Sequence, residues 1–506
     1  MSHLRFVAVT AVAMAVSGSA AMADLTADQV WQDWTGYLAD AGYAVSSDTS
    51  QSGDTLTIRD LALEMDLPDA DGGMSMRVGE IQLVENDDGS VSVILPATLP
   101  IAIAAIDDEA QQVTAAVEIA HEALDLTISG TPDDMDYTYT AEVLTLALTG
   151  LQAGDETPEI RTAQIRLEDM AGNSLSEPGD TSRDLRQALR AGPVTYELDI
   201  TEPEDGATMA LSGSMAQVVF AGDATIPDSF ESDDVAAALS EGFRFASSVE
   251  YETGRTAYRF EDAGDVLEGT QSSARGRLDT SMGPDGLSYG AGGEDVTMAV
   301  SSSDLPFPVN LNIARLGFDV TMPVIESEAM QEYGVNLELS EFTMSDQLWS
   351  MIDPAAQLPR DPATLRVDLN GTGRLFFNLL DPAEVEGLEG RDSIPGEVES
   401  LTLNELTLEL AGARLSGEGA FTFDSDDLES FGGAPAPEGT LDLRLVGGNA
   451  LLDTLVAMGL VPQDQASGMR MMMGLFATPG DGEDELVSKI EVTGDGQVLA
   501  NGQRLK

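Results

Sequence analysis

The feature that most constrains this chain is a two-residue alternation of apolar and polar side chains. The stretch LTLNELTLELAGARLSGEGAFTFD, residues 401–424, shows it most clearly. Successive side chains of a β-strand point to opposite faces of the sheet, so this pattern predicts strands with one apolar and one polar face. The apolar face must then meet helices of the chain, a second sheet or a bound amphiphile, because burying each leucine is worth about 1.5–3 kcal/mol.

Within the first ten residues of this stretch the parity of the alternation changes. Leu401 and Leu403 occupy odd positions, whereas Leu406, Leu408 and Leu410 occupy even ones. A β-bulge or a turn at Asn404 and Glu405 would return both sets to one face. The glycines within residues 411–413 and 417–419 predict further bends.

The same alternation recurs over most of the chain, and a few helical segments interrupt it. The predicted helices span residues 26–42, residues 232–249, a segment ending near Pro354, and the insert at 447–480. Strands therefore outnumber helices, and hairpins join many of them. We predict an α+β fold that is mainly antiparallel β, with long, curved, one-sided sheets and a few covering helices.

The order of these elements suggests three regions after an N-terminal leader. We expect a signal peptide at 1–23, a helix plus antiparallel sheet at 24–230, a helix followed by sheet at 231–358, and a C-terminal sheet region at 359–506 that carries the two-helix insert. A chain of 506 residues is too long for one ordinary core, which agrees with several regions.

The first residues are typical of an export signal. Arg5 precedes an apolar segment at 6–16 that is too short to cross a bilayer, and an Ala-x-Ala pattern predicts cleavage between Ala23 and Asp24. The chain contains no cysteine, which excludes disulfides and a lipoprotein anchor. We expect a periplasmic mature chain without a transmembrane anchor.

The charge balance limits the partners. The formal net charge is −65, with 89 acidic residues against 24 basic ones. Such a field repels phosphate backbones, so we predict no nucleic-acid partner, and it also opposes docking on an anionic bilayer. The acids either keep the chain soluble in a saline habitat or bind cations or basic partners.

Little in the sequence points to catalysis. His121 is the single histidine after the leader, and there is no strained Gly-x-Ser-x-Gly turn, phosphate loop or dinucleotide motif. The acidic turns at 66–73 and 85–90 do not complete a calcium loop and are interpreted as hairpin turns. We predict no catalytic residues, no metal site and no cofactor; a carboxylate-based enzyme is the remaining catalytic alternative.

Two clusters are candidate contacts for an amphiphile. Arg183, Arg186 and Arg190 would share one face of a helix over residues 181–192, where they either pair with the chain's own carboxylates or bind an anionic headgroup. A methionine-rich helix near the C-terminus either fills a core or offers an adaptable apolar contact. Its candidate residues are Met469, Met472, Met473 and Phe476.

Several segments resemble an uncharacterised bacterial envelope family, domain of unknown function 2125. They are LRVDLNGTGRLFFNL at 365–379, the stretch at 401–424, LVAMGLVPQDQ in the insert, KIEVTGDGQVLANGQRL at 489–505, and the segments at 304–324 and 76–96. The resemblance implies no activity and no site residues. The strand patterning is also similar to that of the larger AsmA-like envelope proteins, whose long curved sheets are thought to carry lipids.

These observations lead to two hypotheses of different classes. The first is a non-enzymatic exported protein that binds a lipid or another amphiphile in envelope biogenesis. The alternative is a structural or protein-interaction module of the periplasm with a closed core, which would bind a protein partner through its sheet edges or its N-terminal helix. An open apolar face favours the first hypothesis, and a fully covered one favours the second.

Overall fold

The protein is mainly antiparallel β-sheet and forms two compact units, residues 1–267 and 268–506. The predicted region borders near residues 230 and 358 remain predictions. The computed structural model describes residues 25–40, 42–67, 72–106, 112–154, 157–203, 206–230, 234–381, 384–385 and 396–505. The predicted signal peptide and its cleavage site at Ala23 and Asp24 lie outside these residues.

The first unit starts with a helix and continues as strands joined by short turns. Its helices are α1 (Ala27–Asp40) and α2 (Val235–Ser240). Its strands are β1 (Ala44–Ser52), β2 (Thr55–Leu67), β3 (Gly72–Val78), β4 (Ile81–Glu85), β5 (Val91–Ile94), β6 (Thr98–Ile106), β7 (Gln112–Glu122), β8 (Asp125–Thr131), β9 (Asp134–Ala153), β10 (Glu159–Pro178), β11 (Ser182–Ala191), β12 (Val194–Thr201), β13 (Thr208–Pro227) and β14 (Arg244–Asp262).

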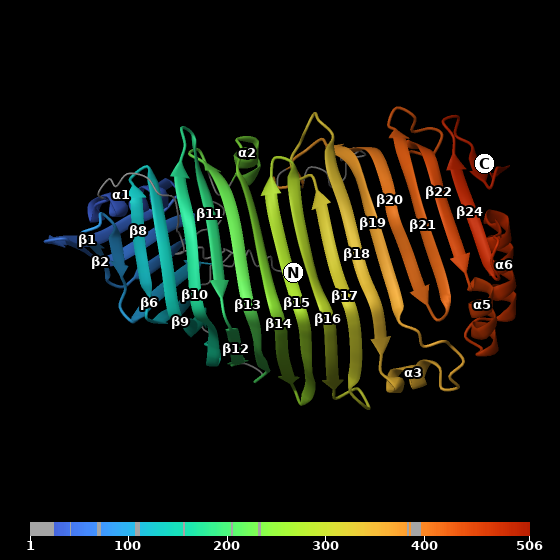
Figure 1. The fold of residues 1–506 in the computed structure, drawn as a ribbon, viewed down its shortest axis with the longest axis horizontal. Helices are drawn as coiled ribbons and strands as arrows, with labels where there is room; N and C mark the ends of the chain where they lie inside the picture. Colours follow the sequence, from blue (N-terminus) through green and yellow to red (C-terminus); the bar gives the residue numbers. More distant parts are fainter. Residues whose placement is uncertain are drawn as a thin grey trace. The chain divides into compact units, whose positions relative to one another are not determined.

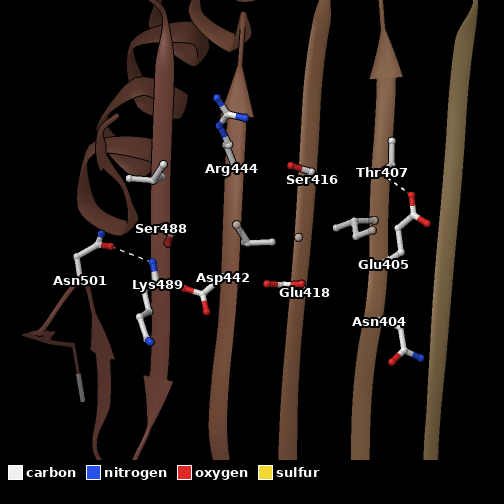
Figure 2. Close-up of a pocket in the computed structure, with 14 residues that line it drawn as sticks. Asn404, Glu405, Thr407, Ser416, Glu418, Asp442, Arg444, Ser488, Lys489 and Asn501 are labelled. Carbon is white, nitrogen blue, oxygen red and sulfur yellow. Dashed lines mark hydrogen bonds between the residues drawn. The ribbon is translucent and has the colours of Figure 1, made fainter. Parts of the chain in front are cut away.

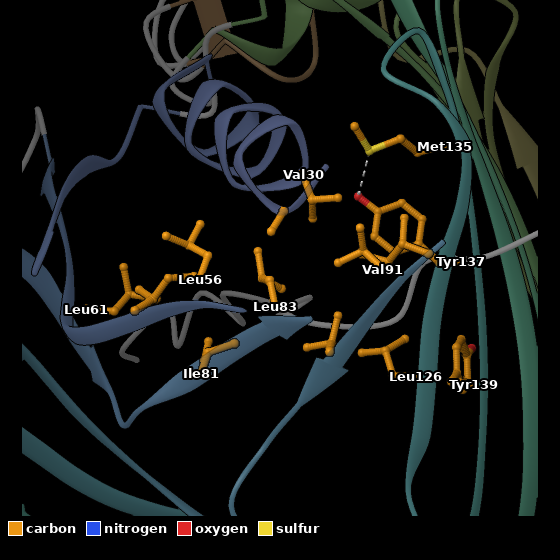
Figure 3. Close-up of a cluster of buried hydrophobic side chains, with 14 of the residues drawn as sticks. Val30, Leu56, Leu61, Ile81, Leu83, Val91, Leu126, Met135, Tyr137 and Tyr139 are labelled. Atoms are coloured by element: carbon orange, nitrogen blue, oxygen red, sulfur yellow. Dashed lines mark hydrogen bonds between the residues drawn. The ribbon is translucent and has the colours of Figure 1, made fainter. Parts of the chain in front are cut away.

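Helix α1 confirms the prediction for residues 26–42. The Thr26 hydroxyl accepts a hydrogen bond from the Gln29 backbone N–H at 3.3 Å, which caps the helix, and Gly42 follows its end with a φ of 88°. Val30 is fully buried and points from α1 towards Leu83 on β4 (Figure 3). The helix therefore covers the apolar face of the first strands and closes a core over them.

Two long strands organise the rest of the first unit. β10 and β13, each 20 residues long, both pair with β11 and with β12. The two shorter strands thus lie end to end between them. β9 pairs with the other side of β10, and β14 pairs with the other side of β13.

The second unit is a simpler meander. Consecutive strands from β16 to β22 pair with their neighbours in chain order, and β22 then pairs with β24 across the helical insert (Figure 1). Its strands are β15 (Asp265–Gly283), β16 (Gly286–Ser302), β17 (Val309–Met322), β18 (Gln331–Met344), β19 (Ala363–Leu375), β20 (Gly396–Leu410), β21 (Ala413–Asp424), β22 (Ala436–Val446), β23 (Thr478–Pro479), β24 (Glu485–Val492), β25 (Val498–Ala500) and β26 (Gln503–Arg504), and its helices are α3 (Asp346–Ile352), α5 (Gly448–Ala457) and α6 (Gln463–Phe476).

The predicted bulge is confirmed. In the β20–β21 pair, Leu403 lies opposite Gly419 and Leu406 lies opposite Gly417, with a register shift between them. The bend predicted at residues 417–419 is wrong, because these residues lie inside the continuous strand β21. The bend predicted at residues 411–413 is confirmed, because Ala411 and Gly412, both with positive φ, form the turn between β20 and β21.

Two helix predictions need correction. The segment at 232–249 forms only the short helix α2 before β14 begins at Arg244. Residues 181–192 form strand β11, not a helix. This strand is hydrogen-bonded to β10 on one side and to β13 on the other, and that pairing outweighs the helical spacing of its three arginines.

Candidate functional site

One row of leucines crosses the sheet of the second unit. In an antiparallel pair, residues directly opposite each other project to the same face. Following these pairs from β17 to β24 gives one leucine on each of seven strands, which we call the leucine row. Its members are Leu316, Leu339, Leu365, Leu408, Leu415, Leu445 and Leu486.

The rows beside it are also mostly apolar, and together they form the leucine face. The bulge between Leu403 and Leu406 keeps the leucines of β20 on this face despite their change of parity. The face comprises the leucine row, a second row with Phe318, Leu337, Val367, Leu406 and Leu443, and a third row with Val320, Val335, Leu369, Leu403, Leu441 and Ile490.

The leucine face is not buried. Leu316, Leu408 and Leu337 keep 44%, 40% and 36% of their surface exposed. None of the seven side chains of the leucine row is buried. Cross-strand neighbours shield such side chains only from the sides, so this exposure indicates that little packs on top of them in the part of the chain that the structure describes.

The opposite face of the same strands is polar. Arg366 reaches Glu338 at 3.3 Å and Arg374 reaches Glu397 at 2.6 Å. Arg444 on β22 lies 2.6 Å from Glu485 on β24, and this contact holds the pKa of the Glu485 carboxyl below its usual range. Such pairs at the surface contribute little stability, so this face is a solvated one.

An open depression of about 490 Å³ lies across β20, β21, β22 and β24. Its lining is mixed: charged side chains such as Glu405, Asp442 and Arg444 (Figure 2) alternate with Leu406 and Leu443 of the leucine face. Among the described residues, no group of three or more His, Cys, Asp or Glu side chains is placed to hold a metal ion. The mixed charges and open form suit water and counter-ions better than a defined substrate.

The helical insert lies at the β24 end of the leucine face. The Ser488 hydroxyl, which projects from this face opposite Leu443, donates a hydrogen bond to the Phe476 carbonyl at the end of α6 at 2.6 Å. A Cβ added at Gly448, the start of α5, would lie 2.6 Å from the Leu445 side chain. Both ends of the α5–α6 hairpin therefore contact the leucine face directly.

The methionines of α6 do not fill a core. Met469 and Met472 are 48% and 58% exposed, Phe476 is 37% exposed, and Met473 is partly buried. Core filling, one of the two interpretations, is therefore wrong for most of this cluster. The adaptable apolar contact remains.

The three arginines do not share a face. On strand β11, Arg183 projects to one face, and Arg186 and Arg190 project to the other. Arg183 bonds Asp33 of α1 at 3.0 Å and the Ser176 hydroxyl at 2.8 Å, and its guanidinium lies 5.9 Å from the Tyr37 ring centroid.

The other two arginines of the cluster are more exposed. Arg186 lies 3.4 Å from Glu177, and Arg190 is exposed. For Arg183 and Arg186, pairing with the chain's own carboxylates is therefore the interpretation that the geometry supports. A headgroup role for the cluster remains a prediction.

The remaining sequence candidates have local partners. His121 on β7 has its Nε2 atom 3.0 Å from the Pro96 carbonyl. In the turn at 85–90, the Asp88 carboxylate accepts hydrogen bonds from the Ser90 backbone N–H and hydroxyl, which lowers the Asp88 pKa. This turn joins β4 to β5, so its hairpin interpretation is confirmed. The core of the other acidic turn, residues 68–71, lies outside the described residues.

A model of one protein family matches residues 247–504, which is half of the chain. The family is described as uncharacterised proteins conserved in bacteria, domain of unknown function 2125 (DUF2125). This chain belongs to DUF2125. No curated protein matches the chain.

The DUF2125 match contains the leucine face and the α5–α6 hairpin entirely. It also contains the resembling segments at 304–324, 365–379 and 401–424 and all but the last residue of the segment at 489–505, whereas the segment at 76–96 lies outside it. Within the described residues of this DUF2125 protein, no helix is long and apolar enough to cross a membrane.

Sequence reasoning alone did not identify the leucine row. It recognised the alternation on β20 and β21 but could not align seven strands that are separated by up to 170 residues between Leu316 and Leu486. It also missed Met471 and Leu475, which are 78% and 49% exposed on α6. Leu408 and Leu415 lie close to the turn between β20 and β21, whereas Leu415 and Leu445 lie far from the connection between β21 and β22, so no constant spacing in the sequence marks the row.

Proposed function

We propose that this protein is a non-enzymatic, exported carrier that binds the acyl chains of a lipid or another amphiphile along the leucine face. The observation that carries the proposal is the leucine row, of which no member is buried among the described residues and of which Leu316 and Leu408 are 44% and 40% exposed. Apolar surface of this extent on a soluble chain is typical of a surface that a ligand or partner covers. The export-signal pattern of the first residues supports a periplasmic location.

The dimensions of the row suit acyl chains. Neighbouring strands lie about 4.8 Å apart, so six steps from β17 to β24 span about 29 Å. This is close to the ~30 Å hydrocarbon core of a bilayer, which two acyl chains fill end to end. One acyl chain would therefore cover about three strand spacings, and the row could hold two.

The chemistry of the face also suits hydrocarbon. Its three rows carry leucine, valine, isoleucine and phenylalanine, and the charged residues of the same strands, such as Arg366 and Glu338, project to the other side. A bound chain would meet no unpaired polar side chain there. The negative charge of the protein would disfavour a polyanionic headgroup, so the substrate class is a neutral or weakly charged amphiphile.

The test is native mass spectrometry of the mature protein isolated from its own periplasm, with organic extraction of what it carries. We expect a stoichiometric acyl lipid or fatty acid. Covering the exposed 40% of one leucine is worth about 0.6–1.2 kcal/mol, so each substitution Leu316→Gln or Leu408→Gln should weaken binding about three- to eightfold.

Ile94→Gln provides a matched control, because Ile94 is 49% exposed but lies in the first unit. It should leave the bound lipid unchanged. A protein that carries no lipid, and gains none after incubation with lipid vesicles, would reject the proposal.

The rival function is a protein-interaction module. Two observations in the first unit support it. Helix α1 closes a core there, and among the described residues β1 pairs with β2 alone. An unpaired strand edge can accept a strand of another protein. A lipid-free mass together with a co-purifying protein, lost when Ser46→Pro blocks β1, would favour this module.

A further inference from the structure

Helix α6 carries an apolar surface that points away from its own unit. Met469, Met471, Met472 and Leu475 are 48%, 78%, 58% and 49% exposed, and we call them the methionine face. At about 100° per residue they span an arc of about 160° on the last two turns of the helix. Ala466, on the other side of α6, is fully buried. An apolar stripe of this width normally packs against something, and no described residue covers it.

The methionine face continues from the leucine face. The C-terminal end of α6 contacts the leucine face through Ser488, and the start of α5 lies against Leu445 of the leucine row. An acyl chain that leaves the leucine row at its β24 end would therefore meet the α5–α6 hairpin first.

The charges around the methionine face indicate which kind of surface it can bind. Arg470 is the basic residue of α6, and its guanidinium pairs with Asp453 of α5 at 2.5 Å. Asp453 remains 72% exposed, and Asp464 lies in the first turn of α6. The face itself is therefore neutral with acids beside it, so an anionic bilayer is repelled. Flexible thioether side chains adapt to a fluid surface rather than to one fixed shape.

We propose that the methionine face docks the protein onto the surface of a zwitterionic lipid bilayer and thereby places the β24 end of the leucine face at the membrane. Docking requires only α6. The consequence, that acyl chains pass between the bilayer and the leucine row, rests on the proposed function. The mode is that of an interfacial helix whose apolar side chains enter the headgroup region.

The test is flotation of the mature protein with vesicles of pure phosphatidylcholine. We expect the protein to float with the vesicles, and Met471→Gln with Met472→Gln to reduce its partitioning at least tenfold. Met471→Leu with Met472→Leu should retain flotation, since it keeps the apolar surface. Met351→Gln is the matched control, because Met351 is 65% exposed on α3, and it should float as the parent does.

Three results would overturn the docking proposal: no flotation of the parent protein, flotation only with anionic vesicles, or unchanged flotation of the double glutamine variant. The two proposals fail separately. Leu316→Gln with Leu408→Gln should still float while carrying less lipid. A parent protein that floats but never carries an acyl chain would support docking and reject the carrier function.

Discussion

The N-terminal part of the first unit and the sheet of the second unit are built from the same kind of alternating strands, but the two regions differ in how far their apolar faces are buried. Under α1, Leu83 and Ile58 are fully buried. On the leucine face, Leu408 is 40% exposed. The difference is in the covering helices, because α1 closes over the first strands, whereas the α5–α6 hairpin leaves Leu316 and Leu408 of the leucine row exposed.

This difference teaches that strand patterning alone does not define a core. Both regions gain their pairing from backbone hydrogen bonds, but only the first removes its leucines from water within the described chain. The first region is therefore expected to depend on side-chain packing for stability. The second is expected to keep its apolar face for a ligand.

Core truncation should give the largest contrast. Leu83→Ala should lower the free energy of unfolding of the first unit by about 2–5 kcal/mol, because it opens a cavity beneath α1. Leu408→Ala should cost less than about 1 kcal/mol, because its side chain is already partly in water. Hydrogen exchange of β4 and β20 during urea titration measures the two units separately, and equal losses would remove the distinction.

Alkaline pH should weaken the covered region next. Burial raises the pKa of Tyr139 to about 12, from 10 in an unfolded chain. A raised pKa means that the folded state retains its proton, so this contribution is present below pH 10 and is lost as the pH rises towards 12, by about 2–3 kcal/mol.

Burial also raises the pKa of Tyr137, which acts in the same direction. Tyr139→Phe should flatten part of the pH dependence of unfolding in the first unit. Hydrogen exchange between pH 9 and 12 would show this. Loss of stability in the second unit at a lower pH than in the first unit would contradict the account.

Ion pairs should show the same contrast on a smaller scale. Arg183 and Asp33 are 21% and 14% exposed. Arg183→Gln should lower the free energy of unfolding by about 1–2 kcal/mol, because it leaves the largely buried Asp33 carboxylate without its cationic partner. Arg275 and Glu294 of the second unit are 59% and 48% exposed, and Arg275→Gln should cost less than about 0.5 kcal/mol. Urea titrations at low and high salt would measure both, and the reverse order would be evidence against a covered first region.

Much of the local structure was predictable from the alternation. It indicated the strands, and the parity change at Asn404 and Glu405 indicated a bulge that the register confirms. The helix predicted at 181–192 was wrong, because Arg183, Arg186 and Arg190 are spaced as on one face of a helix although they lie on strand β11. Such spacing decides nothing once β10 and β13 supply hydrogen bonds on both sides.

The candidate site was less predictable for a physical reason. The leucine row depends on the register between strands that are far apart in sequence, and register is a property of the assembled sheet. The exposure of Met471 and Met472 likewise depends on what α6 packs against. An amphipathic helix pattern shows which side is apolar but not whether anything covers it.

The most direct test of the account is photocrosslinking of the mature protein with a fatty acid that carries a diazirine on its chain, followed by peptide mapping. The account predicts crosslinks along the leucine face, at strands β17 to β22, that excess unlabelled fatty acid suppresses. It predicts none in the core beneath α1. Crosslinks confined to that core, or spread evenly over both units, would contradict the claim that the leucine face is the acyl-chain site.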